Sequence, residues 1–164
     1  MKYRKAVFIV TYSIIGNKIE YLILKRKLHW KGWEFPKGGV NIFETKKQAV
    51  KRELKEETGL RALKIKKFNI KGKYDYDKEY PDRPGFKGQT YTLYSAEVKK
   101  GGIKFDKTEH SGYKWASFNE ALKNLTWKNQ KKCLKEVNSC LIYEIQGIQD
   151  IKRKTCSCRK KCRK

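Results

Sequence analysis

Residues 38–60, GGVNIFETKKQAVKRELKEETGL, carry signals for a helix with a defined start and a defined end. Thr45 and Gln48 have the spacing of a capping box, in which each side chain binds the backbone N–H of the other residue. Gly59 stands where a residue of left-handed conformation closes a helix. The sequence therefore predicts a helix from Thr45 to about Thr58, held between two loops.

The predicted helix carries three glutamates on one face. At roughly 100° per residue, Glu53, Glu56 and Glu57 fall within an arc of about 100°. The apolar Val50 and Leu54 lie beside that arc and can face a core. Carboxylates at this spacing repel one another unless positive charge lies between them. A solvated surface helix is one explanation of the three glutamates, and a shared, oxygen-preferring cation such as Mg²⁺ is the other.

The residues around the glutamates favour the cation. Nine residues match the pattern G-x5-E-x7-R-E-U-x-E-E-x-G-U, in which U is a bulky aliphatic residue. They are Gly38, Glu44, Arg52, Glu53, Leu54, Glu56, Glu57, Gly59 and Leu60. This pattern is the Nudix box, so the chain resembles the Nudix hydrolases. The resemblance implies an α/β fold, with a mixed β-sheet sandwiched between α-helices, and hydrolysis of a nucleoside diphosphate linked to another group X.

The resemblance also implies a role for each polar residue of the box. The three glutamates would bind Mg²⁺ or Mn²⁺, and the backbone of Gly38 would approach the metal. Arg52 would orient a metal-binding glutamate, and Glu44 would support the loop. Metal ions neutralise a phosphoanhydride, acidify a bound water and align it for attack. One glutamate must accept the proton of that water, and both Glu53 and Glu56 suit this role.

Regions outside the box bear on the identity of X. Lys37 precedes the box in the run GWEFPKGG, at a position where several Nudix subfamilies place a lysine against phosphate. Residues 109–137 resemble the C-terminal part of the diadenosine tetraphosphate hydrolases that cleave asymmetrically. That resemblance implies Glu109 as a further metal ligand or base, and Tyr113 as a stacking partner for a nucleobase. His110 is not expected to bind metal.

The resemblance is weaker in two places. Many diadenosine tetraphosphate hydrolases have histidine at the position of Gly39. The loop at 71–88, where contacts to the base would lie, does not align clearly. Lys73 and Tyr74 are the candidates for these contacts.

The favoured activity is therefore hydrolysis of diadenosine tetraphosphate to ATP and AMP. The first alternative is an RNA 5′-end pyrophosphohydrolase or decapping enzyme, because the run W-x-F-P-x-G-G also resembles that group and positive charge suits RNA. Hydrolysis of oxidised nucleoside triphosphates is the second. A Nudix-fold binding module without catalysis is disfavoured, because every carboxylate of the box is present.

The charge of the chain is the remaining constraint. The 164 residues include 41 basic and 17 acidic ones, a formal net charge of +24. This balance suits polyanionic partners such as a nucleotide polyphosphate or RNA, although a lysine-rich proteome would produce it too. We predict one Nudix domain at residues 1–150 and a mobile basic tail at 151–164. The three tail cysteines are expected as free thiols, unless Cys133 or Cys140 completes a zinc site with them.

Other expectations follow from the apolar runs. Residues 5–15 and 18–27, separated by Gly16 and Asn17, predict an antiparallel hairpin. No apolar run approaches the roughly 18 residues that cross a bilayer, and residues 1–15 suit a strand better than a signal peptide. We therefore expect a cytoplasmic protein with no membrane contact; the sequence does not fix its oligomeric state, and a monomer is favoured. The other expected elements are a loop at 28–39, one or two strands at 61–76, a strand at 89–98, a short strand or turn at 113–118, and helices at 117–124 and 126–143.

Overall fold

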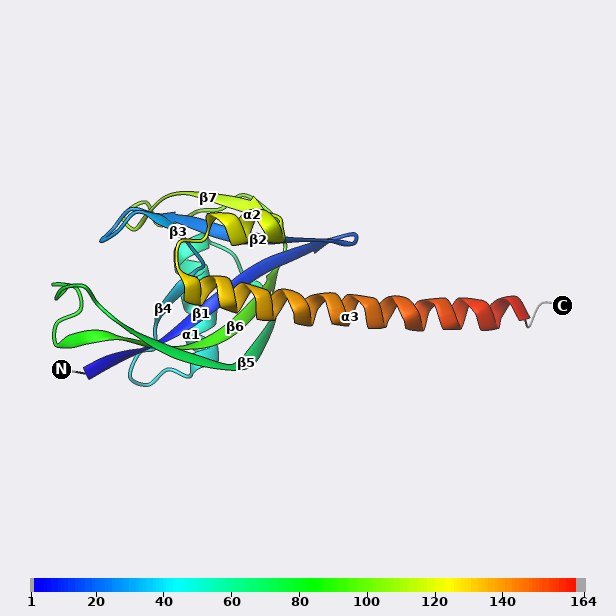
Figure 1. Ribbon diagram of the computed structural model, residues 1–164, viewed down its shortest axis with the longest axis horizontal. Coiled ribbons are helices and arrows are strands. Elements are labelled where there is room, and N and C mark those ends of the chain that lie inside the picture. Colours follow the sequence, from blue (N-terminus) through cyan, green and yellow to red (C-terminus); the bar gives the residue numbers. More distant parts are fainter. Residues whose placement is uncertain (1, 162–164) are drawn as a thin grey trace.

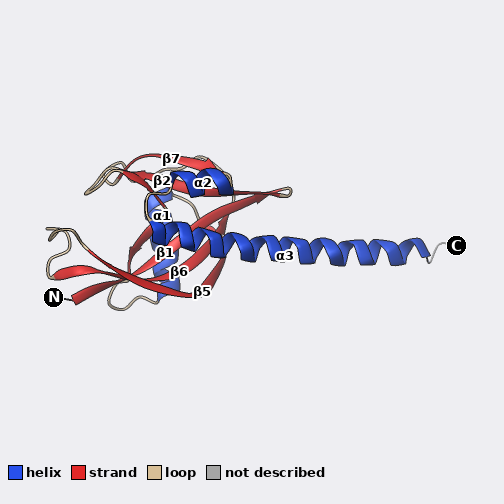
Figure 2. Ribbon diagram, in the orientation of Figure 1, coloured by secondary structure: helices blue, strands red, loops and turns tan. Residues whose placement is uncertain are grey.

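The chain folds around one mixed β-sheet with helices on both faces (Figures 1 and 2). The computed structural model describes residues 2–161, and it describes side-chain surroundings as far as residue 147. The elements are, in order, β1 (Lys2–Ile15), β2 (Lys18–Arg26), β3 (Gly32–Glu34), β4 (Lys37–Gly39), α1 (Lys46–Thr58), β5 (Ala62–Asp75), β6 (Phe86–Val98), β7 (His110–Ala116), α2 (Phe118–Asn124) and α3 (Lys128–Lys161).

The strands of the sheet lie in the order β3-β2-β1-β6-β5, with β4 paired to β1 and β7 paired to β2. The pairing of β1 with β6 is parallel, and the other pairings are antiparallel. The predicted hairpin of β1 and β2 is confirmed, with Gly16 at φ 60° in its turn. A parallel pair needs a long crossover, and here the crossover includes the predicted box helix, α1.

Alternating side chains of β1 enter two separate cores. Phe8 and Val10 belong to the core under α2 and α3, whereas Val7 and Ile9 belong to the core under α1. Because successive residues of a strand point to opposite faces, one buried strand serves both layers. In Figure 1, α1 lies behind the sheet and α3 crosses in front of it. The predicted α/β architecture, a mixed sheet between helices, is confirmed.

Residues 28–39 differ from the loop that the sequence predicts, because they contain β3 and β4. Each of these strands has three residues, which is too short to show an alternating pattern. The pairing of β4 with β1 sets Gly39 opposite Ala6 and Lys37 opposite Phe8. This pairing anchors the start of the box to the centre of the sheet.

The last helix is longer than the sequence predicts. α3 runs past the expected end near Tyr143 and through residue 151, where a separate tail was predicted to begin (Figure 1). Lys, Arg and Gln have high helix propensity, and after Gly147 the sequence has no glycine or proline to stop the helix. The tail cysteines and the predicted mobility lie outside the described side chains. Among the described helices, none is both long and apolar enough to cross a membrane.

Candidate metal and nucleotide site

The capping signals of α1 form as the sequence predicts. Thr45 caps the helix: its Oγ1 accepts from the backbone N of Gln48, and its own backbone N donates to Gln48 Oε1 at 2.8 Å. Gly59 closes the helix at φ 73°. Val50 and Leu54 are fully buried in the core under α1. This packing fixes the rotation of the helix, so Glu53 and Glu57 are buried against β4 while Glu56 is exposed.

Arg52 holds the box together. Its Nε and Nη2 donate to the two carboxylate oxygens of Glu44, at 2.9 and 2.8 Å. Its Nη1 donates to Glu53 Oε1 at 2.7 Å and to Glu56 Oε2 at 2.9 Å. Nη2 also donates to the carbonyl oxygen of Gly39, at 2.8 Å. One guanidinium therefore sets the positions of two box glutamates and ties the loop before α1 to the helix.

Gly38 brings the backbone of β4 against the carboxylate of Glu53. A Cβ atom added at Gly38 would lie 1.8 Å from Glu53 Cδ, so no other residue fits there without displacing the glutamate. The backbone N–H of the preceding residue, Lys37, donates to Glu57 Oε2 at 3.1 Å. The strand thus presents glycine backbone and one amide to two carboxylates of α1.

The two buried box glutamates, Glu53 and Glu57, both have raised pKa values. Burial raises the pKa of Glu57 well above its usual value, Lys37 opposes the rise, and the carboxylates of Glu34, Glu53 and Glu109 add to it. Burial also raises the pKa of Glu53, against the effect of Arg52. Crowded carboxylates of this kind gain from a cation, and an all-oxygen set suits a hard divalent ion. The residues present therefore fit the Mg²⁺ or Mn²⁺ that the box implies.

Glu109, in the turn before β7, and His110, the first residue of β7, join this cluster. One ligand atom each from Glu57, Glu109 and His110 lies within 4.8 Å of the others. Glu109, the predicted additional ligand, also accepts a hydrogen bond from Arg26 Nη1. His110 is not expected to bind metal, and this stays a prediction; the structure buries its ring beside the cluster, with Nε2 3.5 Å from Glu34 Oε1. Neither ring nitrogen has a hydrogen-bond partner among the described residues.

A buried network lies behind the cluster, and the sequence did not predict it. Lys37 Nζ lies 2.8 Å from Glu34 Oε2, and Arg26 Nη1 lies 3.3 Å from Glu34 Oε1. Although burial opposes them, Lys37, His110 and Arg26 hold the pKa of Glu34 at about 2. The available signal was a charged residue inside or next to apolar strand sequence, at Arg26 and Glu34.

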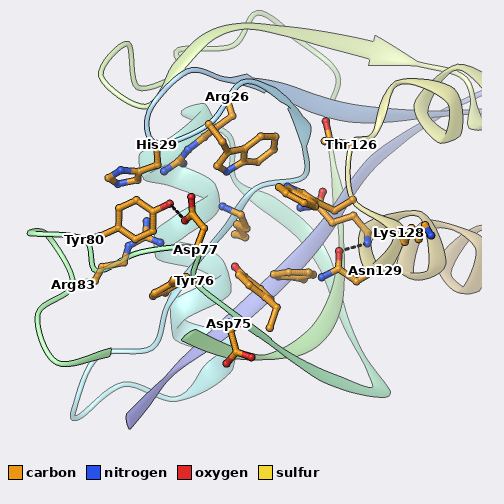
Figure 3. Close-up of a pocket in the computed structure, with 16 residues that line it drawn as sticks. Arg26, His29, Asp75, Tyr76, Asp77, Tyr80, Arg83, Thr126, Lys128 and Asn129 are labelled. Atoms are coloured by element: carbon orange, nitrogen blue, oxygen red, sulfur yellow. Dashed lines mark hydrogen bonds between the residues drawn. The ribbon is translucent and has the colours of Figure 1, made fainter. Parts of the chain in front are cut away.

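A cavity of about 660 Å³ lies next to this network (Figure 3). Lys37 and Arg26 line it, and both also reach the carboxylate cluster: the backbone N of Lys37 donates to Glu57, and Arg26 Nη1 donates to Glu109. Figure 3 shows Tyr76, Tyr80 and Arg83 on one side and Lys128 and Asn129 on the other. The aromatic side chains that line it are Phe8, Trp30, Tyr74, Tyr76, Tyr80 and Trp127.

The aromatic rings of the cavity form two groups. The ring centroids of Tyr76 and Tyr80 are 5.5 Å apart, and Arg83 lies over the ring of Tyr76 at 5.4 Å. On the other side, Trp30 and Trp127 meet edge to face at 5.2 Å. Flat apolar surfaces edged with cations suit a planar base that carries phosphates. Sequence reasoning missed these residues, and the only signal was an aromatic residue in the run LTWKN, which opens the last helix.

The four predicted substrate contacts lie in different places. Lys37 and Tyr74 line the cavity, whereas Lys73 lines a separate hollow on the other face of the sheet. Tyr113 is not among the lining residues; it lies on β7 with its ring 6.0 Å from that of Phe105. The structure therefore brings two of the four together, and all four roles stay predictions.

Comparison with known proteins agrees with this geometry. The family model for the NUDIX domain matches residues 2–137. The chain therefore belongs to the Nudix family, and it is an enzyme that acts on phosphoanhydrides.

One relative and two solved structures illustrate the similarity to other Nudix proteins. The RNA pyrophosphohydrolase of a Nitratiruptor species is 30% identical over 128 residues, which covers 73% of this chain and 80% of that protein. The Ap4A hydrolase of C. elegans, solved as a binary complex, shares the fold with a TM-score of 0.62 and 24% identity, over 84% of this chain and 98% of that one. The E. coli dihydroneopterin triphosphate pyrophosphohydrolase has a TM-score of 0.65 and 20% identity, over 83% and 97%.

Proposed function

We propose that the protein hydrolyses dinucleoside polyphosphates and cleaves diadenosine tetraphosphate to ATP and AMP. The observation that carries the proposal is the shared border of the aromatic cavity and the carboxylate cluster, formed by Lys37 and Arg26. If the base stacks among the tyrosines and tryptophans of the cavity, the phosphates attached to it would extend past Lys37 and Arg26 toward the glutamates. The cavity volume of about 660 Å³ suits one nucleotide unit of such a substrate rather than two.

Glu53, Glu56 and Glu57, with Glu109, would hold the divalent ions. When bound, these ions supply neutralisation of the phosphoanhydride and a more acidic water. Arg52 positions Glu53 and Glu56, and either of them would accept the proton of the attacking water. Glu56 is the more accessible of the two, because its side chain is 58% exposed and that of Glu53 is 12% exposed.

A second candidate, removal of pyrophosphate from triphosphate-ended RNA, is favoured by a different observation. The relative from Nitratiruptor, 30% identical over most of both chains, is named an RNA pyrophosphohydrolase. The net charge of +24 also suits an RNA backbone. Both candidates place a 5′-nucleoside in the cavity and an anhydride at the glutamates, so they differ only in what lies beyond the cleaved phosphates.

A substrate panel separates the candidates. The purified protein with Mg²⁺ would be given diadenosine tetraphosphate, triphosphate-ended RNA and an oxidised nucleoside triphosphate, in water labelled with heavy oxygen. We expect ATP and AMP from the dinucleotide, with the label in a single product. Two ADP molecules, or brisk pyrophosphate release from RNA without cleavage of the dinucleotide, would contradict the first candidate. Glu57→Gln serves as the inactive control for every substrate.

A further inference from the structure

A second hollow, of about 400 Å³, lies on the face of the sheet opposite the aromatic cavity. Its polar lining consists of Lys5, Lys46, Lys71, Lys73, Thr90 and Thr92. We call it the lysine groove. Phe8 and Tyr74 line the cavity, whereas Lys73, the neighbour of Tyr74, lines the groove. Because adjacent strand residues point to opposite faces, the two hollows lie on opposite faces of the sheet.

Strand register places the lysines in rows. Lys5 of β1 and Lys73 of β5 both pair with Thr90 of β6, so the three side chains lie abreast on one face. Lys71 pairs with Thr92, one row further along the same face. Lys46, the first residue of α1, reaches down from the helix and donates from Nζ to Thr92 Oγ1 at 2.9 Å. Three separate elements thus deliver four ammonium groups to one hollow.

No carboxylate among the described residues neutralises these charges, although Lys46 donates to Thr92 and Lys73 lies over the ring of Tyr3. Within the described part of the chain, none of the four lysines forms an ion pair with a carboxylate. Burial lowers the pKa of Lys46, and the nearby charges of Lys71, Lys67 and Lys5 lower it further. Lysines on β5 alone would be explained by protection of a sheet edge against aggregation. That explanation does not cover Lys5, on the interior strand β1, or Lys46, on a helix.

An exposed aromatic residue lies between two of the groove lysines along the chain path. The backbone N of Val40 donates to the carbonyl oxygen of Lys5 at 2.9 Å, which fixes the loop before α1 beside β1. The loop ends at Lys46, and Phe43 in its middle is 102% exposed. An exposed phenyl ring three residues before a groove lysine can stack on a base while the lysines neutralise the phosphates.

We propose that the lysine groove binds the phosphodiester backbone of single-stranded RNA, with Phe43 stacking on one base. An anionic membrane is the competing partner for lysines beside an exposed aromatic ring. It fits less well, because the four lysines line a hollow on the face of the sheet, and a single strand can follow a hollow more closely than a flat bilayer can. The site lies outside the catalytic cavity and acts whichever phosphoanhydride the enzyme cleaves.

The test measures binding of a 5′-hydroxyl oligouridine of about twelve nucleotides, which has no anhydride to cleave, by fluorescence anisotropy from low to moderate salt. The groove variant Lys5→Gln/Lys46→Gln/Lys71→Gln is compared with the control Lys18→Gln/Lys123→Gln/Lys135→Gln. The control removes the same charge from exposed positions elsewhere. We expect the groove variant to lose at least about ten-fold in affinity and its salt slope to become shallower by about two. The control should stay within about two-fold.

Phe43→Ala isolates the stacking contribution. It should weaken binding at least about five-fold with an unchanged salt slope, and Phe43→Trp should restore it. Melting temperatures establish that each variant folds; if the triple variant does not, Lys71→Gln alone should weaken binding and Lys71→Arg should not.

Three outcomes overturn the proposal: equal losses in the groove and control variants, no loss in the groove variant, or groove-dependent binding to phosphatidylserine vesicles without binding to RNA. Because the probe is not a substrate, these outcomes are independent of the proposed hydrolysis.

Discussion

Arg52 and Glu44 are joined by two parallel hydrogen bonds, Nε to Oε1 at 2.9 Å and Nη2 to Oε2 at 2.8 Å. A planar guanidinium can pair with a carboxylate in this way and still direct its remaining N–H groups elsewhere. Here they reach Glu53, Glu56 and the carbonyl oxygen of Gly39. The pair is therefore the joint through which the loop before α1 positions the proposed metal ligands.

The first prediction follows from this geometry. Arg52→Lys keeps the charge but loses the planar, forked set of N–H donors. A lysine can therefore bind Glu44, or Glu53 and Glu56, but not all three. We expect kcat to fall about a hundred-fold with a smaller change in KM, measured by initial rates at saturating Mg²⁺. Lys51→Gln, on the exposed side of the same helix, should change neither constant by more than about two-fold. Equal effects of the two substitutions would contradict a positioning role for Arg52.

The second prediction concerns Glu57, which is 6% exposed and has a raised pKa because of its burial. A cation beside this carboxylate should stabilise the fold, so Mg²⁺ or Mn²⁺ should raise the melting temperature of the wild-type protein. In Glu57→Gln the metal-induced rise should shrink and the hydrolysis rate should fall on the order of 10³-fold. Differential scanning fluorimetry with and without chelator measures the first effect. Undiminished turnover in excess chelator would disprove the metal assignment.

The box was predictable because its signals are local. Thr45, Gln48 and Gly59 fix the helix by contacts within three or four residues, and the spacing of the glutamates then fixes their face. The aromatic cavity was not predictable in this way, since Phe8, Tyr74 and Trp127 meet only after the sheet forms. The strands β3 and β4 are likewise set by pairing with β2 and β1 rather than by their own three residues.

Buried charge was the other feature that local patterns did not predict. Arg26, Glu34 and Lys37 appear in the sequence as ordinary charged residues near strand ends. Their burial depends on β2, β3 and β4 coming together, and each becomes acceptable there because the others are present. In contrast, the length of α3 was underestimated because apolar periodicity stops before the helix does.

The third prediction uses Glu34, whose pKa is held near 2 in the folded protein against an ordinary value of 4.5. A lowered carboxyl pKa contributes stability that is complete above pH 4.5 and is lost as the pH falls toward 2. Glu34→Gln leaves Lys37 without its ion-pair partner and Arg26 with Glu109 alone, and it should cost about 3–5 kcal/mol at neutral pH, a fall in melting temperature on the order of 10 °C. The difference from wild type should narrow between pH 5 and pH 3. A constant difference over that range would argue against the ion pairs as its cause.

The fourth prediction compares two aromatic residues. Trp127 lines the cavity, whereas Tyr113, which the sequence suggested as a stacking residue, does not. Trp127→Ala should raise KM for the nucleotide about ten-fold, because loss of base stacking costs about 1–3 kcal/mol. Tyr113→Ala should leave KM within about two-fold. The reverse result would move the base from the cavity to the neighbourhood of β7.

The fifth prediction concerns residues 151–164, which hold eight Lys and Arg and no acid. Truncation after Asp150 should leave turnover of a small dinucleotide within about a few-fold, because every candidate catalytic residue precedes it. RNA binding at low salt should weaken, and its salt dependence should become shallower, since each lost phosphate contact removes counterion release. Affinity measured over a series of salt concentrations on the full and truncated chains tests this.

A zinc site formed by the tail cysteines makes the opposite forecast. Metal bound between the tail cysteines and Cys133 or Cys140 would require the end of α3 to fold back on the helix, so truncation would lower the melting temperature and remove bound zinc. Burial raises the pKa of the Cys133 thiol to about 11, which disfavours the thiolate that zinc needs. We therefore expect no zinc by elemental analysis and an unchanged melting temperature after truncation. RNA binding that keeps both its affinity and its salt slope in the truncated chain would show that the tail is not a polyanion-binding arm.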